Sequence, residues 1–521
     1  MTANTSVAER KATPSQLTPP SLLAHNAVLN VGSEGWIFLV LLVAMPKLVS
    51  FLGDASFGLF SLSWVVIGYL TFLDIGVNRA ATKFISEHLV RGDEAAVRRV
   101  VRTAVAANLG LGISGALILV VISPYLVHSL FKVSANLQQQ ARWTFDAVAL
   151  ALPVLLVQGI FRAVLTSYQR FGWINLVNIA ATTAQWTAAC WLAWKGHAVA
   201  VAVLATVIVR LIATVVYGRM MFRLLPHLRL FRGGSMTGLV HLLRFGGWVS
   251  VSQVVSPVLV YLDRMLIASF VSLAAVTLYT VPYELMTRLR VIPSSLALTL
   301  YPAFSERGAR EQKFHRQQLY ERSIRYLLLL LLPGILLLAA LGPDVLTLWM
   351  GPSFAGKTAG VLGILALGVL VNGISYVPYN MLQAIGRPDL TGKFHLFELP
   401  LYILLCLTLI PRWGILGAAA ASTARFTLDC GLLFWAASKY GHCSLRQFWV
   451  GPFPRILLVG GVFAMGLLTI RLSMHRLPVR LALSAASSLL YIPAAWSLVV
   501  ERQEKPRIRS AVLVLFRQAV S

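Results

Sequence analysis

Acidic residues are the scarcest charged class in this chain, with 19 Asp and Glu against 45 Lys and Arg among 521 residues. Charged residues of both signs make up only 12% of the sequence, whereas hydrophobic residues make up 57%. A soluble chain of this size needs far more charge to cover its surface. The composition therefore excludes an ordinary soluble protein.

Cysteine is scarce too, and the four cysteines have no metal-ligand spacing, which favours small packing roles. No Gly-rich phosphate-binding loop followed by Lys and Ser or Thr occurs, which argues against an ATP-driven protein. The formal net charge of +26 does not indicate nucleic-acid binding. Its basic residues are spread over the connections between apolar runs instead of being gathered in a soluble basic domain.

Apolar runs of about 20 residues recur along the chain, the length that a helix needs to cross a hydrocarbon core of about 30 Å. The runs are continuous rather than alternating, which favours helices over a barrel. They predict an all-α polytopic membrane protein with about 14 transmembrane helices. The predicted spans are 22–52, 56–85, 103–130, 143–167, 173–194, 197–222, two within 245–304 that meet near 271–274, and then 326–350, 357–385, 394–411, 414–438, 455–473 and 480–500.

Lys and Arg are concentrated in the connections on one side of these spans. That side carries residues such as Arg98, Arg229 and Arg307, whereas the opposite connections carry fewer, such as Lys195. The positive-inside rule then places both termini in the cytoplasm. Residues 1–20 are polar and lack the apolar core of a signal peptide, so they predict a disordered cytoplasmic tail.

An internal repeat divides most of the chain into two units. Residues 50–87 align without gaps on residues 269–306, with Ser-Phe, Leu-aromatic and Ser-Glu pairs in the same order. Both units start and end on the same side, so they predict two parallel-repeat six-helix lobes plus two extra C-terminal helices. The predicted divisions are the tail at 1–20, an N-terminal lobe at 21–223, a cytoplasmic inter-lobe loop at 224–243, a C-terminal lobe at 244–440, extra spans at 441–501 and a basic cytoplasmic tail at 502–521.

Several arginines fall inside the predicted spans, where each charge costs at least roughly 2.5–3.5 kcal/mol and needs a partner or a wet cavity. A guanidinium group stays charged and grips phosphate through two parallel hydrogen bonds. We therefore predict that these arginines line a cavity for an anionic substrate. The candidate substrate-binding residues are Arg79, Arg264, Arg288, Arg290, Arg210 and Arg425.

Other roles stay open for some of these arginines. Arg79 and Arg290 lie near helix ends, from which the side chain can reach the headgroups. Arg288 and Arg425 each lie four residues from a carboxylate, so that an intrahelical pair can neutralise them.

Spans that accept several charges predict a pathway for a solute, and carboxylates inside them suggest how transport is driven. A carboxylate that takes up H⁺ or Na⁺ in one state better than in another shifts the balance between those states. The preferred candidates are Asp74 and Asp263. No cofactor, metal site or catalytic residue is expected. The full set of ion-coupling or charge-pairing candidates is Asp74, Asp263, Glu284, Glu398 and Asp429.

A resemblance to a known family rests on the segments FGLFSLSWVVIGYLTFLDIGVNRAATKF, LVYLDRMLIASFVSLAAVTLYTVPYELM, LYPAFSE and LQAIGRPDLTGK. They resemble Wzx-type polysaccharide or O-antigen flippases of the multidrug/oligosaccharidyl-lipid/polysaccharide exporter superfamily, over about residues 22–440. The resemblance implies a central cavity lined by the first, second, seventh and eighth spans. It also implies flipping of undecaprenyl-diphosphate-linked oligosaccharide to the outer leaflet of the bacterial inner membrane, by alternating access, for exopolysaccharide or O-antigen synthesis. The expected partners are that lipid-linked oligosaccharide, membrane lipids and the glycan polymerase machinery.

Two other functions stay open. An ion-coupled multidrug or small-metabolite exporter of the same superfamily predicts a cavity dominated by acids and apolar surface, and the excess of intramembrane arginine argues against it. A membrane enzyme of glycan assembly needs large outward loops with acid and base residues, whereas the outward loops here are short. A transporter that is not an enzyme is the favoured prediction.

Overall fold

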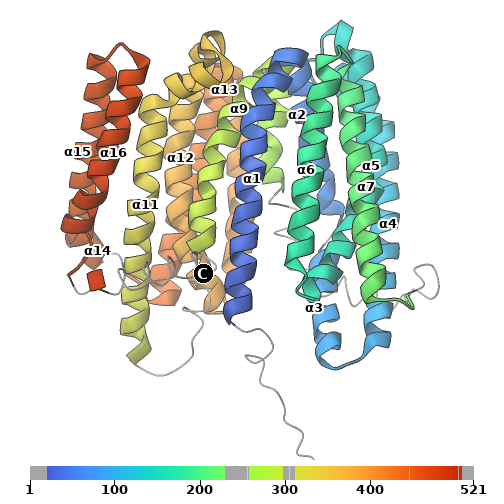
Figure 1. The fold of residues 1–521 in the computed structure, drawn as a ribbon, viewed down its shortest axis with the longest axis horizontal. Helices are drawn as coiled ribbons and strands as arrows, with labels where there is room; N and C mark the ends of the chain where they lie inside the picture. Colours follow the sequence, from blue (N-terminus) through green and yellow to red (C-terminus); the bar gives the residue numbers. More distant parts are fainter. Residues whose placement is uncertain are drawn as a thin grey trace, which may run out of the picture.

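The computed structural model describes residues 20–74, 76–228, 255, 257–296, 304, 311–444, 446–502 and 504–506. Its helices lie side by side and run along one common direction (Figure 1). Nearly all of the predicted tails at 1–20 and 502–521 lies outside the described residues, as do most of the inter-lobe loop at 224–243 and the adjoining ends of the seventh and eighth spans.

Helices occupy each predicted span of the first half. Gly53, with φ 77°, allows the sharp turn from the first helix to the second. The elements are α1 (Pro20–Leu52), α2 (Asp54–Leu70), the 3₁₀ turn η2 (Thr71–Asp74), α3 (Val77–Val90), α4 (Glu94–Tyr125), the π segment η3 (Leu126–Leu130), α5 (Ala135–Ser167), α6 (Phe171–Trp194) and α7 (Val199–Leu224).

The second half follows the same plan. Residues 257–270 and 291–296 are helical. Element α13 consists of two helices that meet at Gly414, where φ is 58° and ψ is −131°. It therefore contains both the eleventh and the twelfth predicted spans. The labelled elements are α9 (Leu273–Thr287), the 3₁₀ turn η4 (Arg288–Arg290), α11 (Glu311–Met350), α12 (Pro352–Ala384), α13 (Pro388–Gly441), α14 (Arg446–Val450), α15 (Pro452–Ser473) and α16 (Leu477–Leu498).

The second predicted span is wrong in one respect, because the structure divides it into α2, η2 and α3. Gly76 adopts φ 73° immediately before α3, a left-handed conformation that glycine reaches without strain. The Asp74 carboxylate then accepts a hydrogen bond from the backbone N–H of Asn78, at 3.1 Å. The predicted span runs past this break, although the polar residues Asn78, Arg79 and Lys83 follow it.

The outer surface of the bundle is apolar. Ten segments of the described chain are long and apolar enough to cross a membrane. Large side chains such as Val121, 78% exposed, and Leu472, 70% exposed, point outward. Exposed apolar surface of this extent is unfavourable in water and favourable in lipid. The predicted all-α polytopic membrane fold is confirmed.

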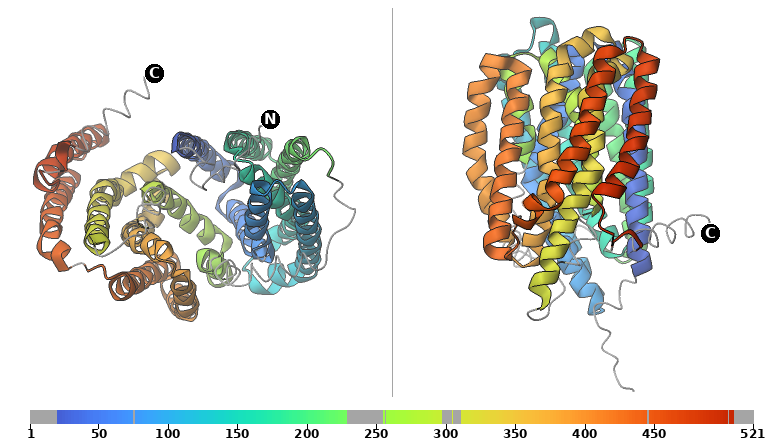
Figure 2. Two further views of the ribbon diagram at one scale, coloured as in Figure 1. Left: turned by 90° about the horizontal axis from the view of Figure 1, so that it is seen from below. Right: turned by 90° about the vertical axis from the view of Figure 1, so that its left-hand side faces the viewer.

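Two groups of helices lie beside each other (Figure 2). Helices α1 to α7 pack among themselves, α9 packs with α12 and α13, and α11 packs with α12. Helix α9 begins 219 residues after α2, the same offset that separates residues 50 and 269 in the aligned repeat. The extra helices α15 and α16 lie outside the second group. An ion pair of 2.7 Å from Arg480 to Asp344 ties α16 to α11.

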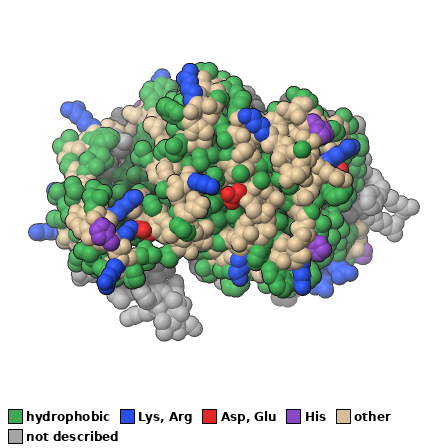
Figure 3. Space-filling view, turned by 90° about the horizontal axis from the view of Figure 1, so that it is seen from above, with side chains coloured by type: hydrophobic (Ala, Val, Ile, Leu, Met, Phe, Trp, Pro, Cys, Tyr) green, Lys and Arg blue, Asp and Glu red, His purple; other side chains and the backbone are tan. Residues whose placement is uncertain are grey.

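The two groups meet closely at the end of the molecule where α1 turns into α2 (top of Figure 1). A Cβ atom on Gly58 of α2 would lie 1.8 Å from the carbonyl oxygen of Leu273 on α9, so the two backbones are in contact. Close by, the Thr277 hydroxyl donates to the carbonyl of Asp54 at 2.6 Å. On this end face, Lys and Arg side chains are scattered singly and few acidic side chains lie among them (Figure 3).

Candidate functional site

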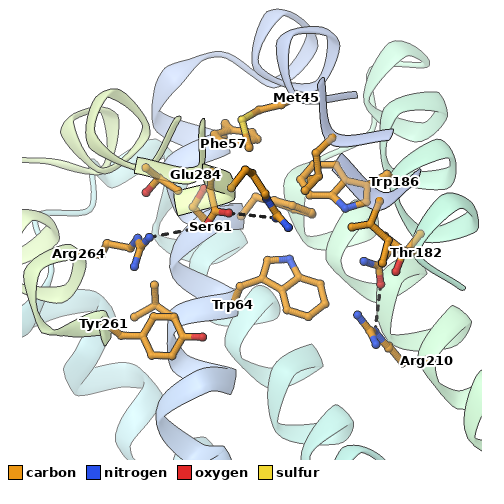
Figure 4. A pocket seen from close by; sticks show the side chains of 17 residues that line it. Met45, Phe57, Ser61, Trp64, Thr182, Trp186, Arg210, Tyr261, Arg264 and Glu284 are labelled. Atoms are coloured by element: carbon orange, nitrogen blue, oxygen red, sulfur yellow. Dashed lines mark hydrogen bonds and ion pairs between the residues drawn. The ribbon is translucent and has the colours of Figure 1, made fainter. Parts of the chain in front are cut away.

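A pocket of about 260 Å³ lies between the two groups of helices, below their close contact. We call it the central pocket. Side chains from α1, α2, α6 and α7 line it from the first group, and side chains from residues 257–270, α9 and η4 line it from the second. Figure 4 shows Arg264 and Arg210 on opposite sides, with the rings of Trp64 and Tyr261 between them.

Arg264 is the most deeply buried of the cationic side chains that line the pocket, with 3% of its surface exposed. Its Nη2 atom lies 3.6 Å from Glu284 Oε1, and its Nη1 atom donates to the carbonyl of Val260 at 3.1 Å. The guanidinium group also lies 4.2 Å from the centroid of the Tyr283 ring. A carboxylate, a backbone carbonyl and a phenol ring therefore hold this buried cation at the pocket wall.

Arg288 pairs with carboxylates on both sides of the pocket. Its Nη2 atom lies 3.2 Å from Glu284 Oε2, the intrahelical pair that the spacing predicts. Its Nη1 atom lies 3.8 Å from Glu34 Oε2 on α1, in the other group of helices. Glu34 is more than half exposed. Because an exposed ion pair at this distance is weak, Arg288 is free to exchange Glu34 for another anion.

Arg210 supplies a third cation from α7. Its Nε atom donates to the Gln185 side-chain oxygen at 3.0 Å, and its guanidinium group lies 5.6 Å from the centroid of the Trp64 ring. No carboxylate of the described chain lies within ion-pair distance of it. Three guanidinium groups thus line the pocket against one lining carboxylate, which makes the pocket attractive to an anion.

Aromatic rings fill the space between these cations. Trp64, Trp186 and Tyr261 all line the pocket, and Phe60 contacts Trp186 edge to face, with ring centroids 5.7 Å apart. Flat aromatic faces pack well against apolar or sugar-like rings, while the indole N–H and phenol O–H groups can donate hydrogen bonds. The central pocket therefore suits a ligand that joins an anionic group to a polar ring system.

Arg290 and Arg425 lie elsewhere, on a second pocket of about 330 Å³ within the second group of helices. Arg290 donates to the Tyr376 hydroxyl at 3.3 Å. The pair expected between Arg425 and Asp429 does not form, because the Arg425 guanidinium lies over the rings of Tyr402 and Phe426. Glu398 is fully buried beside this pocket.

Asp263 has a full set of hydrogen-bond donors. Its carboxylate accepts from the Tyr279 hydroxyl at 2.6 Å, from the Ser422 hydroxyl at 3.2 Å and from the backbone N–H of Arg264 at 2.7 Å. Ser422 in turn contacts the Tyr402 hydroxyl at 3.1 Å. This network joins residues 257–270 to α9 and α13, so it fixes the wall from which Arg264 projects.

Asp74 and Arg79 do not line the central pocket. Asp74 is buried within the first group, where its Oδ1 atom accepts from the Asn108 amide at 3.0 Å, and Arg79 is exposed on α3. The same Asn108 amide donates to the carbonyl of Leu156 on α5, at 2.9 Å. These bonds join η2, α3, α4 and α5 and indicate a structural role for Asp74.

Replacing Asn108 by Ala should lower the free energy of unfolding by about 1–3 kcal/mol, because Asp74 and the Leu156 carbonyl would lose a buried donor. We expect a lower melting temperature of the purified protein in detergent. Ser114→Ala on the exposed face of the same helix is the control and should leave the melting temperature unchanged. An unaltered melting temperature in Asn108→Ala would contradict this account of Asp74.

Gln185 and Trp64 line the pocket and Glu34 pairs with Arg288, but none of the three stands out in the sequence as a site residue. The sequence gives no sign of the contact that Glu34 makes, since its partner Arg288 lies far along the chain. Gln185 and Trp64 carry no charge, so nothing marks them among many polar and aromatic residues in spans. The sequence offered one signal for such partners. An intramembrane arginine such as Arg210 needs a polar neighbour, so a polar residue on an adjacent span is expected beside it.

Residues 23–307, more than half of the chain, match the family described as "Polysaccharide biosynthesis protein". The Shigella flexneri protein named "Putative O-antigen transporter" is 24% identical over 433 residues, which cover 82% of this chain and 99% of that protein. The Haloferax volcanii protein named "Probable flippase AglR" is 26% identical over 181 residues, covering 34% of this chain and 38% of that protein.

Two solved structures share the fold. The lipid II flippase MurJ in an inward closed conformation gives a TM-score of 0.69 at 12% identity, over 91% of this chain and 99% of that one. An inward-facing MATE multidrug resistance transporter of the MOP superfamily gives a TM-score of 0.62 at 14% identity, over 80% of this chain and 98% of that one. The likeness to these two structures extends over most of the chain and confirms the predicted fold. This chain belongs to the polysaccharide biosynthesis protein family.

Proposed function

We propose that this protein flips a lipid-linked oligosaccharide across the membrane and that the central pocket receives the anionic head of that substrate. The observation that supports this proposal is the convergence of Arg210, Arg264 and Arg288 from both groups of helices on one aromatic-lined pocket. The relatives named as an O-antigen transporter and as a flippase favour the same substrate class. The MurJ-like fold provides two helical groups that can move against each other.

The chemistry of such a substrate matches the pocket. A lipid-linked sugar diphosphate has an anionic head, a polar glycan and a long apolar tail, and unaided passage of the head through hydrocarbon is prohibitive. Guanidinium groups replace the water that solvates the diphosphate. The aromatic rings and the Gln185 amide face the first sugars, while the tail stays in the surrounding lipid.

Glu34 has a distinct part in this proposal. In the described state its carboxylate occupies one side of Arg288, the position that a phosphate oxygen would take. The substrate would displace Glu34, because a diphosphate offers Arg288 more negative charge and two acceptors at once. Loss of this ion pair would remove a contact between α1 and η4. Substrate binding would therefore weaken the contact between the two groups of helices beside the pocket.

We propose residues 21–223 and 244–440 as the lobes that move. The closed end, at the turn from α1 to α2, would face the outside of the bacterial inner membrane, and both termini would lie in the cytoplasm. Transport would then take undecaprenyl-diphosphate-linked oligosaccharide outward by alternating access, for synthesis of O-antigen or exopolysaccharide. The glycan polymerase that receives the flipped unit is the expected neighbour.

The test is complementation in a strain that lacks the gene. The deletion strain should accumulate a lipid-linked oligosaccharide and lose the corresponding surface glycan. An Arg288→Ala copy should restore about ten- to a hundredfold less glycan than the unaltered gene, because a charge-assisted hydrogen bond contributes about 1.5–3 kcal/mol. Arg288→Lys should restore an intermediate amount, because it keeps the charge but not the paired geometry.

Arg219→Ala is the matched control, since Arg219 is exposed on α7 away from the pocket. Equal expression of all variants is checked by immunoblot of membranes. Normal surface glycan in the deletion strain, or full restoration by Arg288→Ala, would reject the proposed function.

A further inference from the structure

An apolar groove of about 620 Å³ lies between α1 and α6, directly outside the central pocket. The two helices pack side by side (Figure 1). On α1 the lining residues run from Trp36 to Phe51, which spans about 22 Å at a rise of about 1.5 Å per residue. We call this feature the α1–α6 groove. It is longer than half of a hydrocarbon core of about 30 Å, so it can hold a lipid chain through the depth of one leaflet.

Small side chains form the floor of the α1–α6 groove and large rings form its walls. On the floor, the Cys190 thiol donates to the carbonyl of Ala44 at 3.4 Å, so the two helices touch there. The walls include Trp36, Trp191 and Trp194, each roughly half exposed. Exposed apolar surface of this shape is favourable only against lipid or another apolar chain.

Trp36 distinguishes this groove from an aromatic belt at the headgroups. Such a belt accounts for Trp194, the last residue of α6, because tryptophans near helix ends anchor a protein at the membrane interface. Trp36 lies 16 residues before the end of α1, about 24 Å further into the bilayer. Its indole N–H donates to the Thr183 hydroxyl at 3.0 Å, which fixes a flat ring at this depth. A fixed aromatic face there suits contact with a bound hydrocarbon chain.

Trp186 connects the α1–α6 groove to the central pocket. Among the described residues, it is the side chain that lines both (Figure 4). Hydrogen bonds join α1 to α6 on either side of it along α6, at Thr183 and at Cys190. Between these contacts an indole ring separates the two compartments. A tail attached to a head group in the central pocket therefore has a short path into the groove once this ring turns.

Lys47 places a cation at the end of the groove near the turn from α1 to α2. It is exposed, lines the groove and lies five residues before the end of α1. It forms no ion pair with a carboxylate of the described chain. In the proposed orientation this end lies at the outer headgroups, where Lys47 attracts an anionic lipid. An apolar helix of a partner protein would instead bury this charge without a counterion, which is unfavourable.

We propose that the α1–α6 groove binds the polyprenyl tail of the transported lipid and that Lys47 pairs with the diphosphate once the head has crossed. The proposal rests on the proposed function and orientation. The connection through Trp186 favours this lipid over a phospholipid of the bilayer, because a head group held in the central pocket needs a place for its tail close by. The groove would hold the tail while the lobes move and release it into the outer leaflet.

Photo-crosslinking tests the groove directly. Full-length protein with benzoylphenylalanine in place of Val43, an exposed lining residue, is placed in bilayers of phosphatidylethanolamine and phosphatidylglycerol that contain radiolabelled undecaprenyl diphosphate. The ratio of polyprenyl to phospholipid adducts is measured. It should be at least about fivefold higher than with the same probe at Ile208, which is exposed on α7 outside the groove.

A lysine variant tests the diphosphate contact. Lys47→Ala should lower the adduct ratio at Val43 by about fivefold, because a diphosphate carries more charge than phosphatidylglycerol and loses more when the cation is removed. Lys357→Ala, at an exposed position near the start of α12, is the matched control and should leave the ratio unchanged. An unchanged ratio in Lys47→Ala would overturn the role of this lysine.

The remaining outcomes also decide the proposal. Equal ratios at Val43 and Ile208 would show that the groove holds only bilayer lipid and would overturn it. Protein adducts at Val43 would overturn it too, because they would identify a partner chain as the occupant. If the protein with the probe at Val43 does not reach the membrane, the probe is moved to Leu39, another exposed residue of the groove.

Blocking the groove tests its part in transport. Thr187→Trp adds a large ring at an exposed lining position and should lower the surface glycan restored to the deletion strain by about tenfold, because the tail would meet an overpacked site. Ile208→Trp is the control and should restore normal glycan. Normal glycan with Thr187→Trp would overturn the part of the groove in transport. Normal glycan in the deletion strain itself would reject the proposed function, whereas the adduct ratio would still report whether the groove binds the polyprenyl chain.

Discussion

Replacing Arg264 by Gln should abolish transport and also lower the free energy of unfolding by about 3 kcal/mol or more, since removal of one partner leaves a buried charge uncompensated. The uncompensated group is Asp263, which is 1% exposed and interacts electrostatically with Arg264. Restoration of surface glycan measures the loss of transport, and thermal unfolding of the purified protein measures the loss of stability.

A double variant separates the two roles of Arg264. Asp263→Asn combined with Arg264→Gln removes both charges and keeps groups of similar size, so most of the lost stability should return. Transport should stay absent, because the diphosphate would still lack its buried cation. Arg98→Gln, which breaks an exposed pair with Glu94, should cost no more than about 1 kcal/mol and leave transport normal. Transport by the double variant at the unaltered rate would show that Arg264 only neutralises Asp263.

The fold was predictable from the sequence because the membrane imposes one simple requirement on each spanning helix. A helix that crosses lipid needs a long apolar run, so hydropathy located the spans that the described residues contain, including the two that meet at Gly414 in α13. The break between α2 and α3 was not predictable in this way. It depends on the backbone of Gly76 and on the hydrogen bond that the side chain of Asp74 accepts, and hydropathy records neither.

The site was predictable only in part. Charge inside a span is costly, which marked three residues as site candidates. All three line the central pocket in the structure: Arg264, Glu284 and Arg288. The sequence could not show which face of a helix each charge occupies. For that reason the sequence groups Arg79 with the cavity arginines, although Arg79 does not line the central pocket.

Two buried carboxylates could not be told apart from the sequence. Asp263 and Glu398 look alike in the sequence, as single acids within apolar runs. The structure separates them, because the chain surrounds Asp263 with hydroxyl and amide donors and gives neither oxygen of Glu398 a hydrogen-bond partner among the described residues. The distinction depends on contacts between residues far apart in the chain, such as Asp263 and Ser422. No local pattern records such contacts.

Replacing Gly58 by Ala should open the closed end of the molecule. The new methyl group would lie 1.8 Å from the carbonyl oxygen of Leu273, and a backbone atom in a helix cannot turn aside as a side chain does. Overpacking of this kind costs about 1–3 kcal/mol, enough to shift the balance between a closed and an open end by about tenfold. Spin labels at Ala135→Cys and Ser353→Cys, both exposed, would report the opening after Cys190 is replaced by Ser.

The distance distribution of Gly58→Ala should gain a longer component that the unaltered protein shows weakly or not at all. Gly110→Ala is the matched control, because its Cβ would meet nothing within 4 Å, and its distribution should not change. Gly68→Ala should give a smaller shift, since its Cβ meets the Tyr261 ring, which can rotate away. An identical distribution in Gly58→Ala, together with normal transport, would show that the contact of α2 with α9 does not hold the lobes together. A longer distance with lost transport would instead mean that closure at this end is a required step of the cycle.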